Sequence, residues 1–302
     1  PFFFNDTATT EIYTLSLHDA LPIYVPRDSA DVWSAPEQFL LDENYEPIDV
    51  AGCPPDGFSA DGQLWGNPLY RWDAMKADGY RWWIDRFRAS AALYDIIRID
   101  HFRGFEGYYA IPGGAATARD GVWRQGPGIE LFHAVRAALG DLPIIAEDLG
   151  FLTEGVHRLR EECGFPGMKV LQFAFDSRED SDYLPHNYPR HCVVYTGTHD
   201  NDTIMGWMHT ASPEDVRFAW EYLRLTEAEG PNWGMMCGAL QSPGDTVILT
   251  MQDLLGLGSE ARMNIPSTLG CNWKWRAAPD SITPELADRL HHVTGLYRRL
   301  PR

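Results

Sequence analysis

The sequence predicts an α/β fold, because short apolar runs alternate with segments of helical periodicity along most of the chain. Apolar runs without alternation are typical of strands buried on both faces, as in a parallel sheet. Five such runs begin at Tyr94, Pro143, Met168, Cys192 and Thr246, and residues 21–25 could form a sixth. Strands and helices in this order favour a parallel α/β architecture.

Four helices are expected between these runs, at residues 82–92, 129–139, 153–162 and 213–226. Thr153 stands at an N-cap position, where its hydroxyl can accept a backbone N–H of the first turn. Glu214 and Asp215 follow Pro213 at the start of another helix, where acidic side chains suit the positive end of the helix dipole.

Polar residues gather where the predicted strands end. The pairs are Arg98 and Asp100, Glu147 and Asp148, His199 and Asp200, and Gln252 and Asp253. In a (β/α) barrel this rim carries the active site, and an open doubly wound sheet would bind ligands there too, but no G-x-G-x-x-G follows a first strand. Eight strands close a barrel and five or six are predicted, so we expect an incomplete barrel, the C-terminal two-thirds of a larger protein.

Composition excludes several classes of function. The 302 residues include 25 Lys and Arg against 43 Asp and Glu, and the net charge of −18 disfavours nucleic acid as a partner. No run of about 18 apolar residues occurs, so no membrane span is predicted. The five cysteines form no C-x-x-C pair, which indicates neither disulfides nor zinc and fits a reducing cytoplasm best.

Residues 1–23 differ from the rest of the chain. They contain no Lys or Arg, and they lack the basic region and cleavage site of a signal peptide. The segment resembles a translated sequencing adaptor, so we predict a non-native segment at 1–23 followed by a catalytic barrel at 24–302. Little packing is expected before about Leu15; an unusual but genuine N-terminus is the alternative.

Three acids at predicted strand ends are the candidate catalytic groups: Asp100, Glu147 and Asp200. Cleavage of a glycosidic bond needs one carboxylic acid to protonate the leaving oxygen and a second carboxylate to attack or to activate water. Arg98 lies two residues before Asp100, on the same strand face, and can hold that carboxylate ionised and aimed. His101 would point to the opposite face and is interpreted as structural.

A loop with many aromatic residues is expected at 56–73, because the stretch is rich in Gly, Asn and Pro. Exposed aromatic faces stack on the C–H faces of pyranose rings, and Trp65 is the best candidate for such a platform. We expect Tyr70 and Trp72 to pack the loop down instead. His199 to Asp202 could suggest a metal, but four consecutive residues cannot all converge on one ion, so no metal is predicted.

Four motifs together resemble the 4-α-glucanotransferases, known as amylomaltases or disproportionating enzymes (glycoside hydrolase family 77, α-amylase clan). They are R-I-D-H-F-R-G-F at 98–105, I-I-A-E-D-L-G at 144–150, G-F-P-G-M-K-V-L-Q-F at 164–173 and Y-T-G-T-H-D-N-D-T at 195–203. The resemblance covers essentially all of residues 24–302 and is more specific than the bare clan motifs.

The resemblance implies a role for each matching residue. Asp100 would be the nucleophile, Glu147 the general acid and base, and Asp200 the third acid. The substrate-binding residues would be Arg98, His199, Asp56, Trp65 and Asn264. The implied fold is a (β/α)₈ barrel with insertions and without a cofactor. The sequence departs from the family at one position. When the family's G-D-x-P-I pattern is aligned on Pro22, Ala20 stands where the pattern has Asp.

The implied reaction is retaining transfer of an α-1,4-glucan segment to another glucan or to glucose, by a cytoplasmic enzyme whose partners are maltodextrins. An α-amylase-type hydrolase with the same triad is one alternative. An inactive, truncated fragment is the other.

Overall fold

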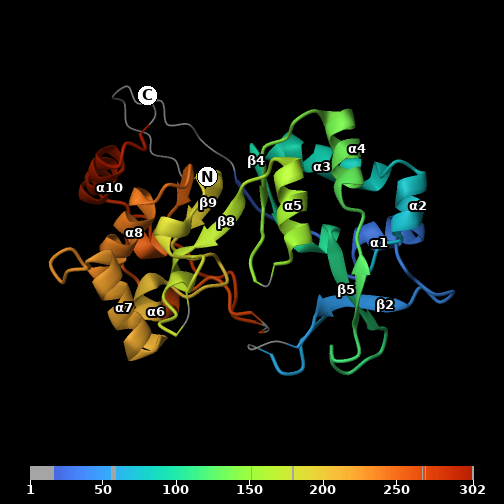
Figure 1. The fold of residues 1–302 in the computed structure, drawn as a ribbon, viewed down its shortest axis with the longest axis horizontal. Coiled ribbons are helices and arrows are strands. Elements are labelled where there is room, and N and C mark those ends of the chain that lie inside the picture. The colour runs from blue at the N-terminus through green and yellow to red at the C-terminus, as the bar shows by residue number, and fades with distance from the viewer. Residues whose placement is uncertain are drawn as a thin grey trace. The chain divides into compact units, whose positions relative to one another are not determined.

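The computed structural model describes residues 17–55, 59–150, 152–178, 180–266, 268 and 270–300; for 17–20 it describes the backbone only. The chain divides into two compact units, one ending at Gly167 and the other beginning at Met168. Each unit is described by itself below (Figure 1).

Among the described residues, seven strands and five α-helices belong to the first unit. The strands are β1 (Leu17–Pro22), β2 (Asp49–Cys53), β3 (Gln63–Pro68), β4 (Ile96–Asp100), β5 (Gly107–Pro112), β6 (Val122–Gln125) and β7 (Ile144–Ala146). The helices are α1 (Ala30–Ser34), α2 (Trp72–Ala77), α3 (Arg81–Leu93), α4 (Ile129–Leu139) and α5 (Glu154–Cys163). Short 3₁₀ helices lie at Pro36–Gln38 and Phe102–Phe105.

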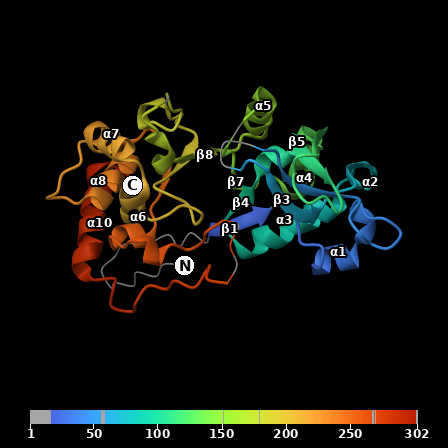
Figure 2. The ribbon, with the colours of Figure 1, turned by 90° about the horizontal axis from the view of Figure 1, so that it is seen from below.

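One part of this unit is a parallel sheet of order β1–β4–β7 (Figure 2). Both Ile97 and Ile99 of β4 are 1% exposed, as expected for a strand covered on both faces. Helix α3 contacts β4 and α4, and α4 contacts α5. Trp83 and Phe87 of α3, both fully buried, join the same apolar core as the sheet.

An antiparallel sheet of order β3–β2–β5–β6 makes up the other part of the first unit. Sequence analysis missed it, because β6 is exposed along its whole length and β2 has three consecutive buried residues, so neither shows clear alternation. The expected loop at 56–73 is therefore partly wrong. Gln63–Pro68 pairs with β2, and Trp72–Ala77 is helical.

The described part of the second unit contains three strands and five α-helices. The strands are β8 (Gly167–Val170), β9 (Cys192–Tyr195) and β10 (Thr246–Ile248). The helices are α6 (Ile204–Thr210), α7 (Pro213–Leu223), α8 (Pro231–Gln241), α9 (Met251–Leu254) and α10 (Pro284–Leu296). Short 3₁₀ helices lie at Leu171–Ala174, Pro185–Asn187 and Ser259–Ala261.

The sheet of this unit has the order β10–β9–β8, and β10 runs parallel to β9. Helix α8 contacts α6, α7 and α9. It has almost no polar face, because Met235, Met236 and Ala239 are all fully buried in the core of this unit. Such an all-round apolar helix is typical of a central position in a domain.

All three predicted strands of this unit end earlier than expected, and the run from Cys192 already ends at Tyr195. The run from Met168 becomes a 3₁₀ helix after Val170, and the run from Thr246 ends at Ile248. Thr250 caps α9 by accepting the N–H of Asp253 through its hydroxyl, so Gln252 and Asp253 lie in a helix and not at a strand end.

Strand β1 begins earlier than the expected Leu21. It ends at Pro22, and the carbonyl of Ile23 accepts the Tyr70 hydroxyl at 2.5 Å in place of a sheet partner. Residues 1–16 lie outside the described part of the chain. The division into an adaptor-derived 1–23 and a barrel at 24–302 stays a prediction, because pairing of β1 uses backbone groups that any sequence supplies.

Candidate active site

The parallel pairing of β4 with β7 brings two of the predicted acids to adjacent strand ends. The register matches Arg98 with Ile145 and Ile99 with Ala146, so Asp100 and Glu147 follow at the same level. Glu147 continues the pairing, because its N–H donates to the carbonyl of Ile99 at 2.9 Å. The sheet thus fixes the backbone positions of Asp100 and Glu147 independently of any contact between their side chains.

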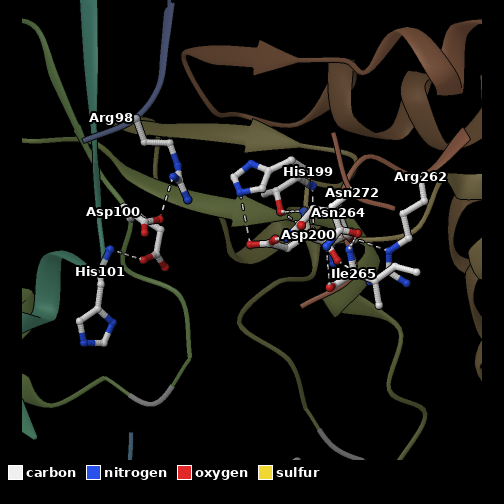
Figure 3. Close-up of polar contacts among 12 residues, drawn as sticks. Arg98, Asp100, His101, His199, Asp200, Arg262, Asn264, Ile265 and Asn272 are labelled. Carbon is white, nitrogen blue, oxygen red and sulfur yellow. Dashed lines mark hydrogen bonds and ion pairs between the residues drawn. The ribbon is translucent and has the colours of Figure 1, made fainter. Parts of the chain in front are cut away.

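Arg98 and Asp100 form the ion pair that their spacing predicts. Arg98 Nη1 lies 3.0 Å from Asp100 Oδ1 (Figure 3). The Arg98 side chain is 7% exposed and that of Asp100 is 42% exposed. A buried guanidinium therefore holds a carboxylate that a ligand can still reach, which confirms the predicted contact.

Glu147 is held by two backbone donors. Its Oε2 accepts the N–H of His101 at 2.7 Å, and its Oε1 accepts the N–H of Leu149 at 2.8 Å. Burial of the carboxyl raises the pKa of Glu147 to about 7, although Arg98 and both N–H groups favour the charged form, and the Asp100 charge raises the pKa further. A carboxyl with this pKa can give and take a proton near neutral pH.

His101 links Glu147 to Trp65. Its backbone is left-handed, with φ of 54°, and this turn aims its N–H at Glu147. Its ring meets Trp65 edge to face, with centroids 4.8 Å apart, and burial lowers the pKa of the imidazole to about 3. His101 is therefore neutral at physiological pH, in line with a structural role. Sequence analysis missed its contact with Glu147, because residue type does not reveal the direction in which a backbone N–H points.

Trp65 belongs to β3 and remains 36% exposed, whereas Tyr70 is 1% exposed. Trp72 is half-buried against the core, so Tyr70 and Trp72 pack as expected. Asp56, the other residue predicted for this loop, lies outside the described residues.

Asp200 lies in the second unit, five residues beyond the end of β9, in a turn crossed by several hydrogen bonds. Asn264 Nδ2 donates to Asp200 Oδ1 at 2.5 Å, and Arg262 donates to the Asp200 carbonyl (Figure 3). His199 Nε2 is 3.3 Å from Asp200 Oδ2, and the His199 carbonyl accepts the N–H of Asn264 at 3.1 Å. Three predicted residues, Asp200, His199 and Asn264, are thus brought together.

The Asp200 turn keeps its functional groups open to a ligand. The Asp200 side chain is 48% exposed, and His199 lies with its ring centroid 5.0 Å from that of Trp273. Trp273 is 44% exposed and was not among the predicted residues. The grouping of an acid, an imidazole, an amide and an indole can accept and stack a sugar ring.

Two buried acids, Asp253 and Asp148, have a supporting role that the sequence analysis did not predict. Asp253 is 1% exposed and accepts the Thr196 hydroxyl and the N–H of Ile204, both at 2.7 Å. Burial raises the pKa of Asp253. In the first unit, Asp148 is 6% exposed and lies 3.2 Å from Arg160. Asp148 directly follows Glu147 in the chain, and Asp253 holds the segments on either side of the Asp200 turn.

These features define a class: an α/β protein whose parallel strands present carboxylates at their carboxyl ends, as in the barrel enzymes that act on glycosidic bonds. The sequence model of the 4-alpha-glucanotransferase family, glycoside hydrolase family 77, matches residues 6–282. The chain therefore belongs to this family, and its fold is an incomplete (β/α)₈ barrel of the α-amylase clan.

Individual relatives agree. The chain is 52% identical over 281 residues to a 4-alpha-glucanotransferase of Clostridium butyricum, covering 92% of this chain and 58% of that protein. It is 49% identical over 304 residues to one of Streptococcus pneumoniae, covering 99% of this chain and 60% of that protein. The chain thus spans less than two thirds of the length of these relatives.

A solved structure, the amylomaltase of Streptococcus agalactiae in complex with acarbose, superposes with a TM-score of 0.90 at 43% identity. The superposition covers 93% of this chain and 57% of the Streptococcus agalactiae chain. The amylomaltase of Corynebacterium glutamicum, at 19% identity and a TM-score of 0.73, shows the same fold.

Within the described residues, no helix is long and apolar enough to cross a membrane. Among the described residues, no two cysteines are joined in a disulfide.

Proposed function

We propose that the protein is a 4-α-glucanotransferase, which moves a segment of an α-1,4-glucan to the 4-OH of another glucan or of glucose with retention of configuration. The arrangement at the ends of β4 and β7 is the observation that supports it most directly. There an exposed carboxylate held by Arg98 stands beside a carboxyl, Glu147, whose pKa is raised to about 7.

The first half of the reaction forms a covalent intermediate. Asp100 attacks the anomeric carbon while protonated Glu147 gives its proton to the leaving glycosidic oxygen. Arg98 keeps the attacking carboxylate charged and oriented through its 3.0 Å contact. The leaving chain departs with a new 4-OH, and the retained chain is bonded to Asp100.

The second half reverses these roles. Ionised Glu147 takes the proton of an incoming 4-OH, the acceptor oxygen displaces Asp100, and a new α-1,4 bond forms. Asp200, His199 and Asn264 would bind sugar hydroxyls and favour ring distortion toward the oxocarbenium-like state. Asp56 and Trp65 would line the acceptor side, with Trp65 as the stacking surface. No cofactor or metal enters this scheme.

A cytoplasmic location, with maltodextrins as the molecules acted on, is part of the proposal. The cysteines, which form no disulfide within the described part of the chain, support this location.

Incubation with maltotriose tests the function. Glucose and maltopentaose should accumulate without new reducing ends, and Asp100→Asn should abolish this exchange while leaving the circular dichroism spectrum unchanged. A steady rise in reducing ends would favour the α-amylase-type hydrolase. A folded chain without turnover would favour the inactive fragment, and near-normal exchange by Asp100→Asn would remove Asp100 as the nucleophile.

A further inference from the structure

An open groove of about 650 Å³ lies in the first unit and is lined by none of the residues assigned to the reaction. Six residues that line it are Arg27, Asp28, Ser29, Trp33, Leu41 and Tyr45. Its two aromatic side chains come from different segments: Trp33 from α1, and Tyr45 from the turn at 42–46. The volume is within the range of small-ligand sites, about 300–1,000 Å³.

Both rings are unusually exposed. Trp33 is 83% exposed and Tyr45 is 64% exposed, whereas Trp83 of the same unit is fully buried. Among the described residues, neither ring is paired with another aromatic ring. A single exposed aromatic residue is ordinary, but two that line one groove leave adjacent apolar faces in water.

The turn that carries Tyr45 supplies a second, independent observation. Tyr45 has a left-handed backbone with φ of 63°, a conformation that is unfavourable for bulky residues and easy for glycine. The turn is firmly closed, because Asp42 Oδ1 accepts the N–H groups of Asn44 and Glu46 at 2.8 and 2.9 Å. An aromatic side chain that is 64% exposed is therefore kept at a position with an unfavourable backbone conformation.

An ion pair fixes this turn to the segment that leads into α1. Arg27 Nη2 contacts Glu46 Oε1, and Ser29 caps α1 by accepting the N–H of Val32. The two ring-bearing segments thus form one connected surface, in which the polar groups of Arg27, Asp28 and Ser29 adjoin the rings.

The chemistry of the groove fits a neutral polyol. Aromatic faces pack on the C–H faces of a sugar ring, while charged and hydroxyl side chains bind its hydroxyl groups. The net charge of −18 disfavours phosphorylated ligands and nucleic acids. We propose that this groove is a second carbohydrate site, which holds a stretch of α-1,4-glucan on Trp33 and Tyr45. The choice of glucan rests on the proposed function.

Binding to the chain that carries Asp100→Asn tests the site without turnover. Maltoheptaose is titrated by calorimetry, and retardation is measured in native gels containing amylose. Trp33→Ala and Tyr45→Gly should each reduce retardation at least about fivefold, since a stacked ring contributes about 1 kcal/mol. Tyr45→Phe keeps the ring and should bind as before, and Trp123→Ala, which removes an exposed ring of β6, is the matched control.

Tyr45→Gly also separates binding from folding, because glycine suits the left-handed position. Its melting temperature should be equal to or above that of the parent chain while its retardation falls. Unchanged retardation of both Trp33→Ala and Tyr45→Gly would overturn the proposal.

The maltotriose assay, run on the chain with Asp100 intact, distinguishes the two proposals. Exchange of maltotriose together with unchanged retardation by the groove variants would refute the second site alone. Reduced retardation by these variants without exchange would support the site and refute the catalytic proposal for this chain.

Discussion

The backbone N–H of His101 donates to Glu147 Oε2 over 2.7 Å, from a residue whose own φ is 54°. The next residue reinforces this link, because the N–H of Phe102 donates to the Glu147 carbonyl at 3.0 Å. The segment that follows the proposed nucleophile, Asp100, therefore also positions the proposed general acid. The first two residues beyond Asp100 donate to the side-chain carboxyl and to the backbone carbonyl of Glu147.

The pKa of Glu147 should respond in opposite directions to its two charged neighbours. Asp100→Asn removes a negative charge and should lower the pKa from about 7, whereas Arg98→Met removes a positive charge and should raise it. Carbon-13 NMR of labelled glutamate side chains measures this pKa directly. The signal that is missing from the spectrum of Glu147→Gln identifies Glu147. Shifts of the same sign in both variants would contradict the electrostatic account.

This pKa also sets the expected pH dependence. The proton-donating form of Glu147 is lost as the pH rises through about 7, so kcat/KM for transfer should fall on the alkaline side with that midpoint. The same raised pKa means that ionising Glu147 opposes folding, so the free energy of unfolding should decrease between about pH 4.5 and pH 7. The effect amounts to at most about 3 kcal/mol. An alkaline limb near pH 9 would rule out Glu147 as the acid that titrates.

The carboxyl groups of Asp100 and Glu147 should lie about 5–5.5 Å apart, the spacing of retaining enzymes. Their adjacent places in the β4–β7 register motivate this value. A crystal structure with a bound glucan gives the distance, and proton NMR gives the anomeric configuration of newly formed products. A separation near 9 Å with inverted products would exclude the double displacement.

Trp65→Ala should lower transfer more than hydrolysis, because a sugar acceptor uses a stacking surface and water does not. The ratio of the two rates should fall about three- to tenfold, as expected for one ring stack. Glucose release and maltopentaose formation from maltotriose give both rates. Trp123→Ala, another exposed indole of the same sheet, is the control, and equal losses of transfer and hydrolysis would make Trp65 a packing residue.

Thr196→Val should destabilise the second unit, because it leaves the buried Oδ2 of Asp253 without its 2.7 Å hydroxyl donor. The expected loss in free energy of unfolding is about 1–3 kcal/mol, measured by urea denaturation. The control is Thr294→Val, whose hydroxyl donates to the Leu290 carbonyl within α10 and should cost under about 1 kcal/mol. Equal losses in the two variants would show that the Asp253 contact adds nothing.

The sequence by itself determined the elements whose signal is local. Helix α4 occupies Ile129–Leu139 as predicted, because its apolar periodicity is regular. Helix α5 begins after the predicted cap, as the Thr153 hydroxyl accepts the N–H of Val156. The contact of Arg98 with Asp100 was also predictable, since side chains two apart in a strand share a face.

Only the tertiary structure decided features that depend on distant segments. The antiparallel sheet joins β2 to β5 across more than fifty residues, so no short window of sequence contains both partners. The left-handed turns at His101 and Tyr45 are set by the contacts around them, and most residues of these types avoid that conformation. The pKa of Glu147 follows from burial and from charges brought close by strand pairing, which residue type and spacing along the chain do not encode.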